Sequence, residues 1–369
     1  MSLERFLVLD NNSGNVLFFE MLLKELGVEC VLSSPTGDDA LIQADKNHIQ
    51  FFISAWELNG MSGTVFIQKV RAKRKRLFAP CLIYSKRMSP EDVSLAHELG
   101  FHDIIAMPFE REKIKQQIKE ILEKELNLDP QEKLLRKIEM YGPEQPMEAF
   151  KLFKESLFKQ GPLQTRAFLS TALVYINLGK FDKAEKCISD ALTNDPTSMR
   201  GLQLHAKLLS RLGKHEEAIA VLEKLNIQSP KNIGAKINLG SAYLQGDRLE
   251  DAKRVFGEVL RVDKDNQDCK DQLAGIAFKE GDFTLAEQLI AETENGNELA
   301  RMFNNLAISL VAKGEFERGI VTYLNAMRLL ADKARLYLLQ YNLGLAYKKK
   351  GDLELCFKAF ADSYISEPT

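Results

Sequence analysis

The sequence has almost no net charge and no long apolar run, and each absence removes a class of protein. Lys and Arg number 50 and Asp and Glu 52, so the formal net charge of −2 gives no overall attraction to nucleic acid or to an anionic membrane. No apolar run is long enough to span a bilayer, and residues 1–10 have neither the charged start nor the apolar centre of a signal peptide. We therefore expect a cytoplasmic protein without membrane contact.

Residues that ligate metals or act as nucleophiles are too scattered to build a site. Five cysteines never occur as CxxC, which predicts reduced and mostly buried thiols: Cys30, Cys81, Cys187, Cys269 and Cys356. Five histidines show no metal-ligand spacing: His48, His97, His102, His205 and His215. The sequence has no nucleophile elbow and no glycine-rich phosphate loop. We therefore expect no enzyme activity, no metal site and no cofactor.

The chain is long enough for more than one domain. At 369 residues it exceeds the size at which a single core keeps growing. Its first third alternates apolar strands, predicted at 6–9, 28–32, 51–54, 81–84 and 104–106, with helices predicted at 15–26, 37–44, 64–70, 90–99 and from 111 onward. Five strands alternating with five helices predict an α/β domain with a doubly wound, flavodoxin-like parallel sheet covered on both faces.

The segment FFISAWELNGMSG, Phe51 to Gly63, reads as a buried strand that ends in a turn, with Gly60 and Gly63 supplying backbone freedom. The end of such a strand borders the ligand crevice of an open α/β sheet. This segment, together with the order of strands and helices around it, resembles the receiver domains of response regulators. The resemblance places the phospho-accepting aspartate at Ala55, and a methyl group cannot accept a phosphoryl group.

The resemblance also assigns the rest of the phosphorylation site. The two metal-binding acids correspond to Asp10 and Asn11, the hydroxyl residue to Ser85 and the lysine to Met107. The resemblance therefore implies a pseudo-receiver that is not phosphorylated. Two interpretations of the remaining polar groups stay open, an inert pocket and residual binding of a metal or anion. Glu57 is set aside as a substitute acceptor, because strand alternation and the following turn point it elsewhere.

From about residue 165 the sequence repeats with a period close to 34. The glycines between helices are 34, 33, 35, 33 and 37 residues apart: Gly179, Gly213, Gly246, Gly281, Gly314 and Gly351. Small residues recur where the second helix of each pair must approach the first: Ala184, Ala218, Ala252, Ala286, Gly319 and Cys356. These features resemble tetratricopeptide repeats, which implies six helix pairs in an all-α, right-handed solenoid, with 131–161 as a degenerate seventh.

We predict three parts in order along the chain. A pseudo-receiver domain covers 1–124, a stiff helical junction with the degenerate repeat covers 125–164, and the repeat array covers 165–369. The junction is predicted to be helical because helix pattern continues to residue 128, a new helix covers 131–140, another amphipathic stretch covers 147–159, and no flexible Gly/Ser tether intervenes.

The repeat family binds peptides or protein surfaces in a concave groove lined by the first helix of each pair. Carried onto this chain, the candidate groove residues are Asn177, Arg200, Gln203, Lys207, Arg211, Asn238, Ser241, Asn304, Tyr341 and Lys348. Arg200, Lys207 and Arg211 share one helical face and would suit an acidic peptide. The alternative is that these positions are only solvated.

Two surfaces are candidates for self-association. Phe357, Phe360 and Tyr364 are predicted to form an exposed apolar flank on the last repeat, which another chain, such as a second copy, would cover. The last helices of a receiver domain form a second surface that its family uses in this way.

Three functions follow from these features. The preferred one is a non-catalytic adaptor of a bacterial signalling, polarity, motility or second-messenger complex, whose pseudo-receiver docks one protein and whose repeats hold another. The second is a signal sensor whose receiver keeps some response to Mg²⁺ or phosphate. The third is a nucleic-acid binder through a basic run: Lys69, Arg71, Lys73, Arg74, Lys75 and Arg76. A solvated helix end explains that run better, because no aromatic residues are interleaved with it.

Overall fold

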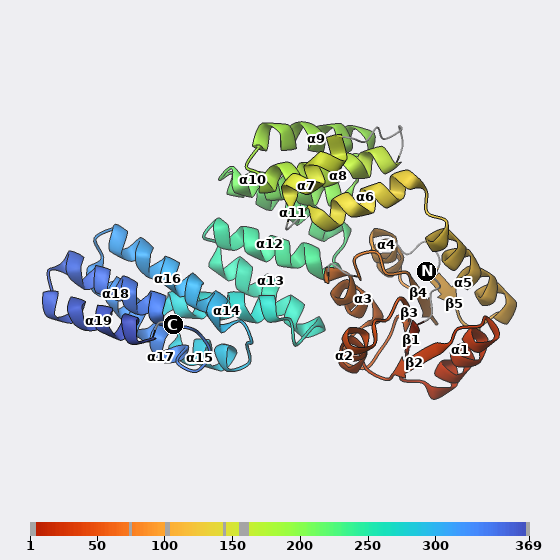
Figure 1. Cartoon of the computed structure of the whole chain (residues 1–369), viewed down its shortest axis with the longest axis horizontal. Helices are drawn as coiled ribbons and strands as arrows, with labels where there is room; N and C mark the ends of the chain where they lie inside the picture. Colours follow the sequence, from red (N-terminus) through yellow and green to blue (C-terminus); the bar gives the residue numbers. More distant parts are fainter. Residues whose placement is uncertain (1–4, 74–75, 100–103, 143–144, 155–161, 367–369) are drawn as a thin grey trace. The chain divides into compact units, whose positions relative to one another are not determined.

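A computed structural model describes residues 5–73, 76–99, 104–142, 145–154 and 162–366 of the chain (Figure 1). Contacts divide the chain into two compact units, 1–248 and 249–369. The first unit contains the α/β part and the first repeats, and the second contains the remaining repeats. None of the described helices is both long enough and apolar enough to cross a membrane.

The first unit begins with a five-stranded parallel sheet. Its strands are β1 (Arg5–Leu9), β2 (Cys30–Ser34), β3 (Phe51–Ala55), β4 (Cys81–Ser85) and β5 (Ile104–Ala106), in the order β2-β1-β3-β4-β5. Each strand is within two residues of its predicted position. Central β3 is buried at every residue, as expected for a parallel strand covered on both faces. The predicted doubly wound α/β fold is confirmed.

Helices cover both faces of this sheet. Helices α1 (Ser13–Glu25) and α5 (Arg111–Leu126) enclose one core, in which Phe19 and Ile118 pack with Phe6 and Phe51 of the sheet. Helices α2 (Gly37–Asn47) and α3 (Gly63–Ala72) pack together, and Phe66 of α3 meets the other face edge-on at Phe52. Helix α4 (Pro90–Glu98) follows β4.

The turn after β3 needs its two glycines for different reasons. Gly60 has a φ of +84°, a conformation that side chains with a Cβ rarely adopt. Gly63 has no such φ, so its role is not the backbone freedom that the sequence predicted. A Cβ at Gly63 would lie 2.0 Å from the carbonyl oxygen of Ala55. The glycine therefore allows α3 to begin directly beside the end of β3.

Helix pairs follow the α/β part. Helix α6 (Pro130–Tyr141), capped by Asp129, packs on α7 (Pro146–Lys154), and α7 packs on α8 (Pro162–Asn177). The end of the amphipathic stretch predicted at 147–159 lies outside the described residues. The first unit continues with α9 (Phe181–Asn194), α10 (Met199–Arg211), α11 (His215–Gln228) and α12 (Ile233–Gln245).

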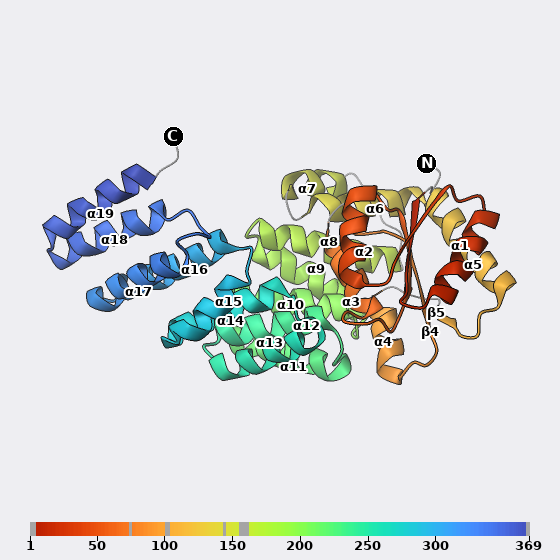
Figure 2. The same cartoon turned by 90° about the horizontal axis from the view of Figure 1, so that it is seen from below.

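In the second unit, all regular elements of the described residues, 249–366, are helices (Figure 2). They are α13 (Leu249–Val262), α14 (Gln267–Glu280), α15 (Phe283–Ala291), α16 (Gly296–Ala312), α17 (Phe316–Leu329), α18 (Tyr337–Lys350) and α19 (Leu353–Ser366). The first helices of successive pairs pack side by side, α14 on α16 and α16 on α18. All six predicted small residues are buried, and a Cβ at Gly319 would lie 2.5 Å from Val311, so close helix approach explains them.

The turn inside the third helix pair differs from the sequence prediction. Five of the predicted glycines, among them Gly213 and Gly281, have positive φ. Gly246 does not, with a φ of −84°, and the left-handed residue in its pair is Asp247, with a φ of 59°. Replacing Gly246 by Asp247 makes the first three spacings 34 residues each. The period is therefore more regular than the glycines suggested.

The last helix pair corrects one predicted surface. Phe357 and Tyr364 are exposed, at 71% and 82%. Phe360 is only half-buried and belongs to its own repeat, because its ring lies 5.3 Å from that of Tyr341 and rests on Gly344.

The five cysteines are free thiols; Cys269 and Cys356 are buried and the other three are half-buried.

Candidate functional site

A cavity of about 260 Å³ lies at the carboxyl end of the sheet. The residues that the receiver resemblance assigned all line it, although they come from four separate segments: Asp10, Asn11, Ala55, Ser85 and Met107. The parallel strands explain this, because the carboxyl ends of β1, β3, β4 and β5 meet at one edge. The cavity therefore occupies the position of a receiver phosphorylation site.

The carboxylate of Asp10 is engaged by three of its neighbours. It accepts hydrogen bonds from the Asn12 backbone N–H at 2.8 Å, from the Asn15 side-chain amide at 2.7 Å and from the Tyr84 hydroxyl. Asp10 is only 5% exposed. Burial, followed by the hydrogen bond to Asp10, raises the pKa of Tyr84, so the phenol stays protonated and remains the donor. Asp10 is therefore held in the role of a structural acceptor.

Two other cavity residues that the receiver resemblance assigned, Ser85 and Met107, are engaged in a hydrogen bond or apolar. The Ser85 hydroxyl donates to the Arg87 carbonyl at 2.7 Å and accepts from the Arg87 N–H at 3.2 Å. Met107 packs against the hydrophobic core of the sheet. No group of three or more metal-ligating side chains occurs among the described residues.

Sequence reasoning missed several residues of this cavity and misplaced Glu57. Tyr84 is the most important omission; its place immediately before Ser85 on β4 was the available signal. Trp56 and Lys86 also line the cavity. Glu57, which was expected to point elsewhere, lines it too and is exposed, because the chain turns at once after β3 and strand alternation no longer applies. Asn15 and its neighbour Asn12 were missed as well, as were Leu58 and Asn59.

The candidate groove residues of the first unit lie on first helices and differ in their exposure. Asn177, Lys207, Arg211 and Asn238 are exposed, whereas the other three are half-buried: Arg200, Gln203 and Ser241. Asn177 donates to the Gly142 carbonyl at 3.3 Å. We call the first-unit candidates on α8, α10 and α12 the first-helix row.

Two cations in this row lie together without a compensating acid. Lys207 and Arg211 are one helical turn apart on α10, and no described residue forms an ion pair with either. Desolvation, with a smaller contribution from Arg211, lowers the pKa of Lys207. Like charges at this spacing destabilise a helix slightly. The pair is therefore a candidate contact for an anionic partner.

Arg200 is not available in the way the sequence suggested. Its guanidinium lies 2.6 Å from Glu139 of α6 and donates to the Ser170 hydroxyl at 3.2 Å. Glu139 also accepts from Arg166 of α8, and its side chain is 4% exposed. Burial opposes ionisation of Glu139, but the two arginines outweigh it and lower its pKa. Arg200 thus closes an internal network.

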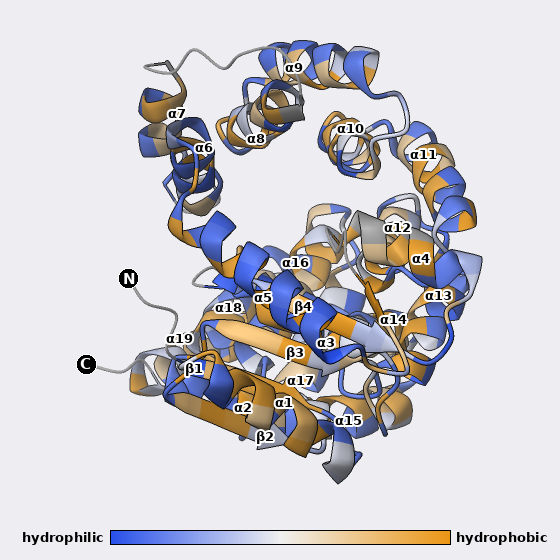
Figure 3. Ribbon diagram, turned by 90° about the vertical axis from the view of Figure 1, so that its right-hand side faces the viewer, coloured by the Kyte–Doolittle hydropathy of each residue, from blue (hydrophilic) through white to orange (hydrophobic). Residues whose placement is uncertain are grey.

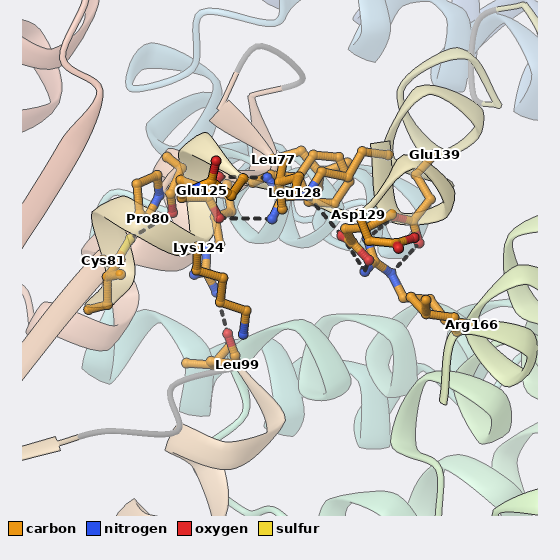
Figure 4. A pocket seen from close by; sticks show the side chains of 18 of the residues that line it. Leu77, Pro80, Cys81, Leu99, Lys124, Glu125, Leu128, Asp129, Glu139 and Arg166 are labelled. Carbon is orange, nitrogen blue, oxygen red and sulfur yellow. Dashed lines mark hydrogen bonds and ion pairs between the residues drawn. The ribbon is translucent and has the colours of Figure 1, made fainter. Parts of the chain in front are cut away.

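The same network reaches the α/β part of the first unit (Figure 4). Arg136 of α6 binds Glu125 of α5 through two hydrogen bonds, at 2.8 and 2.9 Å. The guanidinium groups of Arg136 and Arg166 lie 5.0 and 5.4 Å from the ring centre of Phe78, which precedes β4. Cation–π contacts of this kind favour arginine over lysine. We call Arg136, Arg166 and Arg200, the glutamates that they bind and Phe78 the junction network.

In the second unit the candidate residues have a different chemistry. Asn304 of α16 accepts a hydrogen bond of 2.8 Å from Asn342 of α18, which sequence reasoning did not identify. Tyr341 and Lys348 are exposed on α18. Large apolar side chains are exposed on the same two helices: Ile308, Leu338 and Leu345. Amides and apolar groups therefore predominate here.

The basic run is engaged within the first unit. Lys73 and Arg76 both bind Asp45 of α2, and Arg71 donates to the Leu99 carbonyl. Lys69 also has a partner. Arg74 and Lys75 lie outside the described residues. These contacts argue against the run as a nucleic-acid surface.

Comparison with known proteins agrees with both parts of the chain. A sequence model of the response regulator receiver domain matches residues 6–119, and two models of tetratricopeptide repeats match 169–233 and 209–276. Chemotaxis protein CheY of Pseudomonas aeruginosa is 23% identical over 120 residues, which are 32% of this chain and 97% of that protein.

The repeats have relatives of other kinds. Protein CTR9 homolog of Arabidopsis thaliana is 25% identical over 217 residues, or 56% of this chain, but the match spans only 20% of that protein. The crystal structure of a tetratricopeptide repeat protein from Parabacteroides merdae, 17% identical, covers 65% of this chain and 94% of its own, with a TM-score of 0.44.

Repeats of this family generally mediate protein–protein interaction, and receiver domains serve signal transduction. The chain therefore combines a receiver domain of the response-regulator family with tetratricopeptide repeats, and its role lies in signalling and protein interaction.

Proposed function

We propose that this chain is a non-catalytic adaptor whose receiver domain works without phosphorylation. In this proposal the receiver domain docks one protein and the repeats bind another, within a bacterial signalling, polarity or motility complex. The stiff junction fixes the point at which the repeats are joined to the receiver domain. Information then passes by contact between surfaces, so no covalent mark is needed.

The observation that carries the proposal is the state of the cavity at the sheet edge. A phosphoryl site needs a nucleophilic carboxylate, a metal held by acids and a cation that neutralises charge. Here position 55 is a methyl group, position 107 is a thioether, and the Asp10 carboxylate is held by Tyr84. Because three donors already satisfy Asp10, binding a metal there would first have to break these bonds.

The repeats supply the binding surfaces of the proposed adaptor. In the first-helix row, Lys207 and Arg211 offer two cations to acidic side chains of a partner. In the second unit, the Asn304–Asn342 amide pair lies among exposed apolar side chains. Amides can bond both donors and acceptors of an extended peptide backbone. This arrangement suits a peptide with apolar side chains.

A second function, a receiver that still responds to phosphate or metal, is favoured by one observation. Glu57 and Lys86 line the cavity and supply one carboxylate and one cation. An acyl phosphate on Glu57 would be the covalent form of such a response. The intact mass of the chain after treatment with a phosphoryl donor distinguishes the two functions.

The test is to incubate the full chain with acetyl phosphate and Mg²⁺ and to measure its intact mass. We expect no phosphoryl addition to the natural sequence and no saturable change in the fluorescence of Trp56, the single tryptophan, when Mg²⁺ and beryllofluoride are added. Phosphoryl mass located at Glu57 would reject the adaptor proposal in favour of the sensor.

A matched set of variants shows whether the missing groups are the reason. Asn11→Asp with Ala55→Asp restores the two carboxylates, and Tyr84→Phe then removes the hydroxyl that holds Asp10. We expect phosphorylation to rise from the double to the triple variant. Equal phosphorylation of both would contradict the role assigned to Tyr84.

A further inference from the structure

A lysine of the repeats reaches the receiver domain far from the covalent junction. Lys231, in the turn between α11 and α12, lies 2.7 Å from a carboxylate oxygen of Asp92 at the start of α4. Its ammonium also lies 3.2 Å from the Ser89 hydroxyl and 3.7 Å from Glu91. The ion pair with Asp92 raises the pKa of Lys231, and Lys231 offsets the effect of burial so that the pKa of Asp92 is lowered. Both groups are therefore charged at neutral pH.

This contact closes an arc of helices within the first unit. From α6 to α12 the helices pack in succession, and the arc returns to α4 (Figure 3). A cavity of about 1270 Å³ lies inside, lined by Leu99 and residues 77–81 of the receiver domain, by α5 and α6, and by Arg166 and Arg200 of the repeats. The Arg200 end of the first-helix row therefore faces the receiver domain.

The two links between receiver domain and repeats differ in exposure. In the junction network the Glu139 side chain is 4% exposed and the Arg136 side chain 20%. At the distant link the Lys231 side chain is 45% exposed, and its partners Glu91 and Asp92 are 57% and 13% exposed. Salt screens exposed ion pairs strongly and sequestered ones weakly. The exposed link is therefore the one that a change of ionic strength or a charged partner can open.

We propose that Lys231 with Asp92, Glu91 and Ser89 is an electrostatic latch that holds the repeats of the first unit closed on their own receiver domain. When it opens, the arc swings about the junction network, which stays intact. Opening exposes the start of α4 and widens access to the cavity that Arg166 and Arg200 line. The use of the exposed repeat surface for binding rests on the proposed function, whereas the latch itself does not.

Exposed ion pairs contribute little free energy, so the closed and open forms lie close together, as a switch requires. A partner that binds either uncovered surface would shift the balance toward the open form by its preference for that form. Neutralising or reversing the charge of Lys231 would do the same without a partner.

The experiment uses the full chain and a zero-length carbodiimide cross-linker, which joins a lysine only to a carboxylate in direct contact. At low salt we expect an amide link from Lys231 to Asp92 or Glu91, found by peptide mapping. At ~0.5 M salt the yield of this cross-link should fall at least about threefold, because at that concentration salt screens charges beyond a few ångströms. Absence of the link at low salt would overturn the proposal.

Small-angle scattering then shows whether the contact is the closing element. Lys231→Glu should increase the radius of gyration at low salt, and Lys231→Met should do so less. Lys264→Glu, in the corresponding turn before α14, is the matched control and should leave the value unchanged. The proposal fails if Lys231→Glu, folded by circular dichroism, scatters like the control. Neither outcome depends on whether the receiver domain accepts phosphate.

Discussion

At the scale of single residues, the repeat turns show how a backbone conformation limits the side chain. Five turns between paired helices have glycine in the left-handed region, and the sixth has Asp247 with a φ of 59°. Aspartate tolerates this region better than most residues because its short side chain can hydrogen-bond locally. It still carries a Cβ, which crowds the following carbonyl oxygen.

Asp247→Gly is therefore expected to stabilise the chain by about 0.5–1 kcal/mol, since removal of the Cβ strain outweighs the added entropy of the unfolded chain. Gly213→Asp, in the corresponding turn of the preceding repeat, should destabilise by a similar amount. Denaturant unfolding followed by circular dichroism measures both. A loss of stability in Asp247→Gly would mean that the aspartate side chain stabilises the turn more than its Cβ strains it.

Single residues also show which features can be predicted from the sequence and which cannot. The five strands, the cavity residues Asp10 and Ser85, and the repeat period could be predicted, because each depends on local pattern or on a resemblance of known spacing. Tyr84 as the partner of Asp10 could not, because the two are 74 residues apart and their contact exists only after the sheet forms. The hydrogen bond between Arg200 and Glu139 could not be predicted for the same reason.

At the scale of elements, the junction network joins α5, α6, α8 and α10. Its most sequestered member is Glu139, which binds Arg166 and Arg200. Removing one partner of a buried ion pair is costly, because the other charges lose their compensation. The lowered pKa of Glu139 links this stability to pH.

Glu139→Gln is expected to cost about 3 kcal/mol at neutral pH. Because the folded pKa of Glu139 lies below its ordinary value of 4.5, its contribution is present above that value and is lost as the pH falls from 4.5 through the folded pKa. The difference between natural and variant chains should therefore shrink below about pH 4.5. Urea unfolding at several pH values measures it.

The control for that series is Glu148→Gln, which breaks an exposed pair with Lys151. We expect a change below about 0.5 kcal/mol at neutral pH. A Glu139→Gln effect as small as this would show that solvent reaches the junction network and that it does not stiffen the connection.

At the scale of the whole molecule, the repeats of the two units offer surfaces of different chemistry. The first-helix row of the first unit carries Lys207 and Arg211 without an acidic partner among the described residues. The second unit presents the amide pair and exposed apolar groups such as Tyr341. One adaptor of this kind could hold an acidic segment and an apolar segment separately.

Short fluorescent peptides test this division by anisotropy. An acid-rich peptide should bind the natural chain with an affinity that falls as salt rises, and the double variant Lys207→Glu/Arg211→Glu should weaken it at least about tenfold, because charge-assisted hydrogen bonds are lost. Lys224→Glu, on the second helix α11, should have little effect. An apolar peptide should instead be insensitive to salt and weakened by Tyr341→Ala. If one variant weakened both peptides equally, the two surfaces would act as one and the division would be wrong.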